Sequence, residues 1–493
     1  MEMVSFWMIL LAIYGTLLVL KAILKYANWW LYESQLGIKQ YSLPPGDLGW
    51  PFIGNMWSFL RAFKSSDPDS FISSFVSRFG RTGVYKAFMF GSPSVIVTTP
   101  ETCRKVLTDD DKFKPGWPQA TIELIGKKSF IGISYEEHKR LRRLTSSSIN
   151  GMEALSLYLP YIEETVKSSL EKWTKMGQIE FLTELRKLTF KIIMHVFLSS
   201  ESKLVMEALE REYTTLNHGV RAMGINLPGF AYHRALKARK NLVATLQSVI
   251  NERRNQRKEN LSREAKDMLD ALMDVEDENG RKLSDEEIID VLLMYLNAGH
   301  ESSGHITMWT AVFLAKHPEY LQKAKAEQEE IIKKRPPTQN GLTLKEVRQM
   351  DYLSKVIDET LRLITFSLVV FREAKSDVNI NGYTIPKGWK VLVWFRTVHL
   401  DPEIYPNPKE FNPSRWNNTI PKAGEFLPFG AGSRLCPGND LAKMEISVFL
   451  HHFLLNYQFE QLNPNCSVRY LPHTRPMDNC LARVTKCSSS SST

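Results

Sequence analysis

The feature that most constrains this chain is a glycine-rich loop with one cysteine near the C-terminus. It reads Phe429-Gly-Ala-Gly-Ser-Arg-Leu-Cys436-Pro-Gly438. Because glycine lacks a Cβ, the backbone here can approach a flat ligand closely and adopt a positive φ. A helix is expected from Asp440 to about Leu455, with Asn439 or Asp440 as its N-cap. The start of that helix favours a thiolate over a thiol at Cys436.

Arg434, two residues before the cysteine, can reach an anionic group on the same ligand. The loop resembles the haem-binding sequence of the cytochrome P-450 superfamily, Phe-x-x-Gly-x-Arg-x-Cys-x-Gly, at every fixed position. The resemblance implies haem b, with Cys436 as thiolate ligand of the iron and Phe429, Arg434 and Gly438 at the cofactor. Such a thiolate favours O–O cleavage. The alternatives are an inert buried cysteine and a nucleotide loop; the latter lacks its third glycine and a strand–loop–helix unit.

A second motif matches the same superfamily. Glu359 and Arg362 lie at i and i+3 on an expected helix, a spacing that alone usually gives only a weak surface ion pair. They match the superfamily's Glu-x-x-Arg, and the segment 411–416 follows at its spacing. By resemblance, Arg415 completes a buried triad with Glu359 and Arg362 that fixes the scaffold behind the cysteine loop.

A long buried helix is predicted from Ser284 to Lys316. Ser284 and Glu287 form a capping box, and His317-Pro318 ends the helix. Its apolar middle, Val291–Gly299, should be buried.

The centre of this helix reads Ala298-Gly-His-Glu301-Ser302-Ser. It resembles the superfamily's oxygen-activation segment, in which an acid precedes an alcohol. Oxygen cleavage consumes protons, and an alcohol held by a widened helix turn can relay them from an acid and water. Glu301 and Ser302 are the catalytic candidates. Threonine is usual at the alcohol position, and Ser302 lacks its rotamer-restricting methyl group, so looser coupling is expected. The alternative is that these polar groups serve helix packing.

A basic helical stretch at 138–143 has the superfamily's arginine but not its tryptophan. By resemblance, Arg142, His138 in place of the tryptophan, and Arg372 donate to haem propionates. The other basic residues of the stretch are expected to face outward: Lys139, Arg140 and Arg143. That surface would dock the acidic NADPH–cytochrome P-450 reductase, or it is a plain solvated face. The net charge of +9 suits either use, and no nucleic-acid-binding pattern accompanies it.

The N-terminal residues 3–20 are uncharged and almost wholly apolar, nearly enough to span a bilayer. Lysines and an aromatic belt follow, and the proline-rich segment 43–51 reads as a stiff hinge. A cleaved signal peptide is the alternative, but the charges stand in the wrong order. These features predict a single-pass anchor in the endoplasmic reticulum membrane with the catalytic domain in the cytosol.

The remaining pattern predicts a mainly α fold with small β-sheets, that is, a cytochrome P-450 fold with an N-terminal transmembrane helix. Helical periodicity dominates, for example at 155–173 and 236–254. Short strands are expected at 94–98, 378–385 and 390–394, with Asn381-Gly382 as a hairpin turn. The expected parts are an anchor with interfacial belt (1–32), a hinge (33–51), a catalytic domain (52–485) and a disordered tail (486–493). Five scattered cysteines argue against a disulfide framework.

Runs at 365–375, 378–383 and 428–452 resemble plant ent-kaurenoic acid oxidases. That resemblance implies a small hydrophobic terpenoid substrate and three successive oxidations that begin at carbon 7 and end at gibberellin A12. By family analogy, five residues line the pocket: Ala298, Gly299, Ser367, Leu368 and Val369. The partner of the substrate carboxylate stays open, with His300 a weak candidate.

Three alternatives remain for the function. A triterpenoid oxidase of the same group, β-amyrin-type, shares the chemistry. A haem-thiolate isomerase or dehydratase needs neither oxygen nor a reductase. A non-catalytic haem- or lipid-binding membrane protein would take up no electrons from a reductase. The acid–alcohol pair Glu301–Ser302 argues against the last two.

Overall fold

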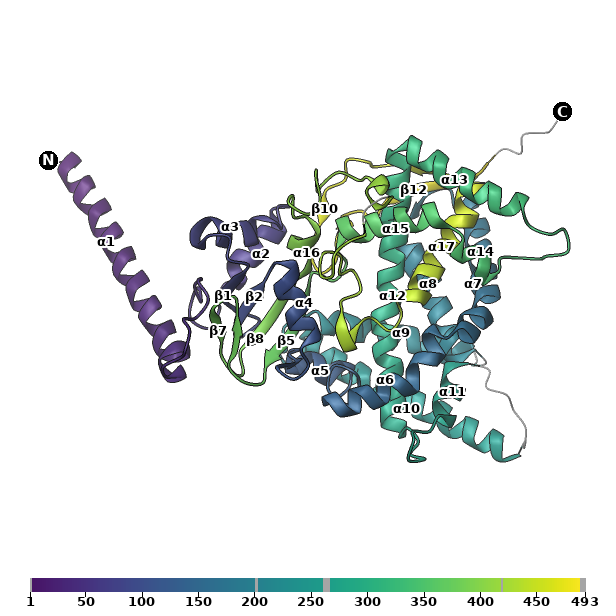
Figure 1. The fold of residues 1–493 in the computed structure, drawn as a ribbon, viewed down its shortest axis with the longest axis horizontal. Helices are drawn as coiled ribbons and strands as arrows, with labels where there is room; N and C mark the ends of the chain where they lie inside the picture. The colour runs from purple at the N-terminus through teal and green to yellow at the C-terminus, as the bar shows by residue number, and fades with distance from the viewer. Residues whose placement is uncertain (1, 200–202, 260–266, 418–419, 488–493) are drawn as a thin grey trace. The chain divides into compact units, whose positions relative to one another are not determined.

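The computed structural model describes residues 2–199, 203–259, 267–417 and 420–487. They form two compact units, labelled by element in Figure 1. Unit 1 comprises Met1–Gly116 and Leu368–Val398, and unit 2 comprises Trp117–Ser367 and His399–Thr493. Most of the tail predicted to be disordered, residues 488–493, lies outside the described residues.

Unit 1 begins with helix α1 (Glu2–Asn28), which continues through a π turn at Trp29–Glu33 and a 3-10 turn at Ser34–Leu36. The helix therefore runs on through the aromatic belt and ends at Gly37, whose φ is 68°. Among the described residues, one helical stretch, Leu11–Leu36, is long and apolar enough to cross a membrane. Its apolar side chains are mostly exposed, as a lipid-facing surface requires.

The sheet of unit 1 has the strand order β1-β2-β8-β5-β3. Only the β2–β8 pair is parallel. The strands are β1 (Val84–Met89), β2 (Ser92–Val97), β3 (Phe113–Pro115), β5 (Val369–Ala374) and β8 (Lys390–Trp394). Its helices are α2 (Met56–Lys64), α3 (Ser70–Phe79), α4 (Pro100–Thr108) and most of α16 (Phe395–His399). Phe59, Phe71 and Trp394 pack together with ring centroids 5.4–6.1 Å apart and tie α2 and α3 to β8.

The predicted hairpin is confirmed as β6 (Val378–Ile380) paired with β7 (Tyr383–Ile385). Asn381 and Gly382 both have positive φ, 51° and 80°, as a type I′ turn requires. The strands β1, β3 and β5 were missed, because buried strands lack the polar–apolar alternation that marks an exposed sheet.

Unit 2 is mainly helical, and helix α12 packs against α8, α15 and α17 within it (Figure 1). Its longer helices are α6 (Tyr135–Asn150), α7 (Met152–Thr174), α8 (Phe181–Leu198), α9 (Lys203–Val220), α10 (Ala231–Glu259), α12 (Asp285–Lys316), α13 (Pro318–Lys333), α15 (Asp351–Ile364) and α17 (Asn439–Asn456). The shorter ones are α5 (Gln119–Ile125), α11 (Met268–Asp274) and α14 (Leu344–Arg348). The strands are β4 (Ile179–Glu180), β9 (Tyr457–Gln461), β10 (Val468–Arg469), β11 (Arg475–Pro476) and β12 (Leu481–Lys486), in the orders β4-β12-β9 and β10-β11.

Helix α12 confirms the predicted boundaries. The Ser284 hydroxyl accepts from the Glu287 amide, and the Glu287 carboxylate accepts from the Ser284 amide at 2.8 Å, so the capping box is complete. Most of the middle of α12 is buried as expected, but Met294, Asn297 and Gly299 are only partly buried and Ala298 is exposed. Ala298 and Ser302 lie four residues apart, so they share a face of the helix that neighbouring elements leave uncovered.

We expect that deleting residues 1–27 releases most of the protein from membranes, because it removes most of the apolar span. The deletion keeps Asn28, whose side chain donates to the Gly49 carbonyl at 2.6 Å, and the ion pair of Glu33 with Lys86. Alkaline carbonate extraction of microsomes, compared with the full-length chain, measures the attachment.

If the shortened protein stays fully in the membrane fraction, α1 is not the sole anchor. The next surface to test would then be the exposed apolar side chains of unit 1: Phe52, Ile53 and Trp57.

Candidate active site

The cysteine loop leads directly into α17. The Cys436 amide donates to the Phe429 carbonyl at 2.9 Å, which closes the loop. Gly430 and Gly432 have φ of 77° and 74°, conformations that L side chains rarely adopt. The N-cap of α17 is Gly438, so the expectation of Asn439 or Asp440 was wrong by one or two residues. The helix starts earlier because Gly438 accepts the cap position without a side-chain bond.

Burial raises the pKa of the Cys436 thiol above its ordinary value, while the Gly438 amide and the charge of Arg142 favour the thiolate. The amide and the guanidinium are therefore the local groups that stabilise negative charge on the sulfur. A bound metal ion deprotonates a thiol ligand outright. The sulfur thus has the donor chemistry of a metal ligand.

Hydrogen bonds from two arginines tie this loop to α6 and to the segment just before α6. Arg142 of α6 donates through Nη1 to the Leu435 carbonyl at 2.7 Å. Arg434 donates through Nη1 to the Phe130 carbonyl at 2.8 Å. The ring of His138, also on α6, is buried with its centroid 5.3 Å from that of Phe130.

The residues around the loop fit a haem group. A Cβ placed at Gly430 or Gly438 would meet no atom within 4 Å, so a flat ring system can approach the backbone there. The Cys436 sulfur would hold the iron of such a group, and Arg142 and Arg434 would supply charged donors suited to the two carboxylates of protoporphyrin.

Three of the predicted site residues belong to unit 1 and are described within it. Arg372 lies in β5 and is buried, and its Nη1 donates to the Phe371 carbonyl at 3.3 Å. Leu368 precedes β5, and its carbonyl accepts from the Phe395 amide at 3.2 Å. Val369 is the first residue of β5 and is partly buried.

The expectation that Arg140 faces outward was wrong. Its guanidinium donates to Asp277 at 2.7 Å and to Glu287 at 2.8 Å, and the side chain is 11% exposed. Arg140 therefore joins α6 to the N-terminal turn of α12, whose acidic residues attract a cation from a neighbouring helix. Lys139 and Arg143 remain exposed.

Glu301 of α12 has a buried carboxylate surrounded by positively charged groups. It accepts from Asn217 Nδ2 at 2.9 Å, forms a close ion pair with Arg221, and lies 3.7 Å from Arg186 Nη2 and from His473 Nε2. Burial by itself raises the pKa of Glu301, but the two arginines outweigh it and hold the pKa well below its usual value. The carboxylate is therefore ionised at neutral pH.

Ser302 points to a different side of α12. Its hydroxyl donates to the Ala298 carbonyl at 3.0 Å, within the helix. Helix α12 remains α-helical through this turn, so the expected widened turn is absent from the described helix. Because the i−4 carbonyl holds the hydroxyl hydrogen, Ser302 presents its lone pairs to the uncovered face next to Ala298.

His300, the weak candidate for the substrate carboxylate, lies between aromatic rings. Its Nδ1 is 3.4 Å from the Tyr213 hydroxyl, and burial lowers its pKa to about 4. At neutral pH the imidazole is uncharged and offers a carboxylate no cation.

The predicted triad residues form one ion-pair network. Arg362 binds Glu359 through two parallel hydrogen bonds of 2.9 Å and 2.8 Å, and both side chains have no exposed surface. Arg415 Nε donates to the same carboxylate at 3.0 Å. Trp416 Nε1 adds a fourth donor at 3.1 Å, and the Asn412 amide adds a fifth at 3.0 Å.

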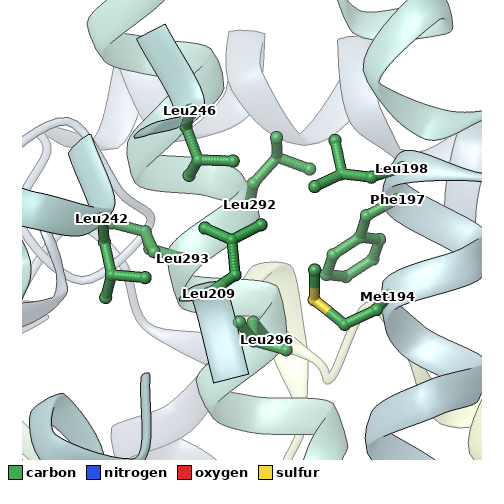
Figure 2. Close-up of a pocket in the computed structure, with 9 residues that line it drawn as sticks. All are labelled: Met194, Phe197, Leu198, Leu209, Leu242, Leu246, Leu292, Leu293 and Leu296. Atoms are coloured by element: carbon green, nitrogen blue, oxygen red, sulfur yellow. The ribbon is translucent and has the colours of Figure 1, made fainter. Parts of the chain in front are cut away.

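An apolar cavity lies elsewhere in unit 2, where Leu292, Leu293 and Leu296 of α12 face α8, α9 and α10 (Figure 2). Its other lining residues are Met194, Phe197, Leu198, Leu209, Leu242 and Leu246. It has room for about one water molecule, and its walls offer no polar partner, so it is a packing void too small for a terpenoid.

A family model described as cytochrome P450 matches residues 44–471, most of the chain.

The chain belongs to the cytochrome P-450 family.

Similar proteins agree with this membership. Ent-kaurenoic acid oxidase 2 of Arabidopsis thaliana is 72% identical over 95% of this chain and 96% of its own length. Ent-kaurenoic acid oxidase of Oryza sativa subsp. japonica is 57% identical over 98% and 96%. A 7,8-epoxymelianol synthase of Ailanthus altissima is 55% identical over 97% of both chains. The structure of a retinoic acid-bound cyanobacterial enzyme, CYP120A1, superposes with a TM-score of 0.81 at 27% identity, over 91% of this chain and all of that one. The predicted P-450 fold is confirmed.

Several residues of this cytochrome P-450 site were missed in the sequence. Trp416 directly follows Arg415, so its closeness to the triad was visible in the motif, but its donor role was not. Arg186, Arg221 and His473 reach Glu301 from 115, 80 and 172 residues away along the chain. No local spacing connects residues so distant in sequence.

We expect Glu359→Ala to lower the free energy of unfolding of this cytochrome P-450 by about 3–5 kcal/mol, because it leaves the fully buried Arg362 without its anion. Urea unfolding followed by tryptophan fluorescence measures the change. Glu460→Ala is the matched control: it removes an exposed pair with Arg483 and should cost at most about 1 kcal/mol.

Equal losses in both variants would contradict the buried network. If Glu359→Ala does not fold, Glu359→Gln keeps an acceptor for Arg362 and should show a smaller loss than the alanine variant.

Proposed function

We propose that this cytochrome P-450 is a haem-thiolate monooxygenase that oxidises ent-kaurenoic acid. The observation that supports this choice of substrate is the 72% identity to Arabidopsis ent-kaurenoic acid oxidase 2 over 95% of the chain. The proposed reaction is three successive oxidations, beginning at carbon 7 and ending at gibberellin A12. Three further ent-kaurenoic acid oxidases are 57–71% identical to this chain.

In this proposal Cys436 ligates the iron of haem b, and the bound haem supplies the oxygen-activating chemistry. Phe429 and Gly438 border the sulfur on either side of the loop. The propionates are assigned to cationic and donor side chains: Arg142, His138, Arg372 and Arg434. Support comes from the loop geometry, from Arg142, which donates to the Leu435 carbonyl of the loop, and from Arg434, a loop residue that donates to the Phe130 carbonyl.

Glu301 and Ser302 carry the proposed proton delivery. Because Glu301 is ionised, it does not store a proton at neutral pH; it orders water and accepts a hydrogen bond from it. The Ser302 hydroxyl rests on the Ala298 carbonyl; when it turns away from that carbonyl it can give up its proton and take another from water on the uncovered face of α12. Ala298, Gly299, Ser367, Leu368 and Val369 are proposed to line the substrate pocket.

Electrons are proposed to come from NADPH through cytochrome P-450 reductase. The exposed basic residues Lys139 and Arg143, on the same helix as Arg142, give an acidic flavoprotein a docking surface. The apolar span of α1 supports attachment to the endoplasmic reticulum membrane with the catalytic domain in the cytosol.

A triterpenoid oxidase is the second candidate. Its support is the 7,8-epoxymelianol synthase of Ailanthus altissima, whose 55% identity spans nearly the whole chain. The higher identity of the ent-kaurenoic acid oxidases, 57–72%, favours the diterpenoid.

We expect microsomes containing the full chain and a reductase to convert ent-kaurenoic acid to gibberellin A12 and to leave β-amyrin unchanged. Mass spectrometry identifies the products, and omission of NADPH or oxygen must stop the reaction. Cys436→Ser should abolish turnover and the red-shifted carbon monoxide band of the reduced protein.

Turnover without oxygen and NADPH would contradict a monooxygenase and indicate an isomerase or a dehydratase. Conversion of β-amyrin alone would replace the diterpenoid substrate, and retention of the band by Cys436→Ser would remove Cys436 as the ligand.

We expect Ser302→Ala to raise the hydrogen peroxide released per NADPH consumed and to lower product formation roughly tenfold or more, because the relay loses its hydroxyl. Ser302→Thr is the matched control: it keeps the hydroxyl, adds the methyl group that restricts its rotamer, and should couple at least as well as serine. Unchanged coupling in Ser302→Ala would exclude Ser302 from the relay.

A further inference from the structure

The groups around Glu301 carry more positive than negative charge. Two guanidiniums, Arg186 from α8 and Arg221 just after α9, face one carboxylate. Their side chains are 23% and 24% exposed, whereas that of Glu301 is 6% exposed. Each arginine is therefore mostly withdrawn from solvent, yet both keep a side through which a ligand can approach. Arginine stays protonated in proteins, so these groups together carry a net positive charge.

The neighbouring groups do not remove this excess. Burial lowers the pKa of His473 to about 4 and that of His305 well below its usual value, so both rings are neutral at pH 7. Arg475 lies close enough to repel Arg186, and its own hydrogen bond goes to Asn479 at 2.6 Å. A mostly buried cation without its own anion is costly, so this arrangement favours an anionic ligand.

Arg186 has hydrogen-bond donors that are not used within the protein. Its nearest charged partner, Glu301 Oε1, is 3.7 Å away, beyond hydrogen-bond range. Its Nε is buried without a hydrogen-bond partner, and its guanidinium makes no hydrogen bond to any side chain or carbonyl in the part of the chain that the structure describes. Arg221, by contrast, contacts Glu301 directly. A planar guanidinium with free donors matches the two oxygens of a carboxylate.

We propose that Arg186 and Arg221 bind the carboxylate of a terpenoid acid, which makes them the subsite that orients the substrate. This inference rests on the proposed function. Glu301 and Ser302 are consecutive residues on different sides of α12, so the subsite lies within one helical turn of the residue proposed to deliver protons. The Phe366 ring, stacked on His473 with centroids 4.0 Å apart, provides an apolar wall beside the charges. Oxidation elsewhere on the skeleton leaves the anchoring carboxylate unchanged, so one subsite holds the substrate through successive steps.

The test compares ent-kaurenoic acid with its neutral methyl ester. Equilibrium dialysis of the solubilised holoenzyme with labelled ligand gives the Kd of each, and turnover is measured in parallel. Arg186→Gln should raise the Kd of the acid about 10- to 100-fold, since a charge-assisted hydrogen bond is lost, and leave the Kd of the ester unchanged. The variant should still fold, because Arg221 remains in direct contact with Glu301 and the Nε of Arg186 has no hydrogen bond to lose.

Lys187→Gln is the matched control, because it makes the same charge change one residue along α8. Lys187 is 60% exposed and pairs with Glu184, so its loss should alter neither Kd. Arg186→Gln overturns the subsite if it changes acid and ester binding equally, or changes neither. A wild-type enzyme that oxidises no ent-kaurenoic acid overturns the proposed function and this inference with it, whereas normal wild-type turnover with unchanged acid binding in Arg186→Gln overturns the inference alone.

Discussion

The scaffold behind the cysteine loop depends on one buried carboxylate. Glu359 has no exposed surface, so its charge must be met entirely by protein groups. Two arginines, an indole and a backbone amide meet it, and Arg362 uses its remaining donors on the carbonyls of His399, Pro408 and Glu410. These bonds fasten a segment with little regular secondary structure to helix α15. Hydrophobic contacts are non-directional, so they would not fix the path of that backbone as closely as these hydrogen bonds do.

The same segment is then joined to the cysteine loop through His399. Its ring is within 2.9 Å of the Thr365 hydroxyl on one side and accepts from the Leu427 amide at 2.9 Å on the other. Leu427 lies two residues before Phe429, whose carbonyl receives the Cys436 amide. Hydrogen bonds alternating with short stretches of backbone thus connect the triad to the cysteine loop. The position of the proposed iron ligand is determined by polar contacts that are satisfied at each step.

Glu301 shows the opposite arrangement around a buried carboxylate. The oxygens of Glu359 accept hydrogen bonds from all the donors that surround them. Glu301 faces two arginines, but it leaves the Nε of Arg186 without a hydrogen bond. A structural network is complete in the free protein, whereas a binding site is completed by its ligand. This difference separates the part of the P-450 fold that supports the site from the part proposed to select the substrate.

Local signals in the sequence determined the family, the cysteine loop, the boundaries of α12 and the β6–β7 hairpin. Each rests on residues close together in the chain, where side-chain chemistry acts directly on the backbone: a capping box, an Asn-Gly turn, a glycine loop. Tertiary structure alone decided which way Arg140 turns, that α12 keeps a regular turn at Ser302, and that Arg186, Arg221 and His473 gather at Glu301. These residues meet only because separate helices pack together, and the charge of a side chain does not reveal which distant element will satisfy it.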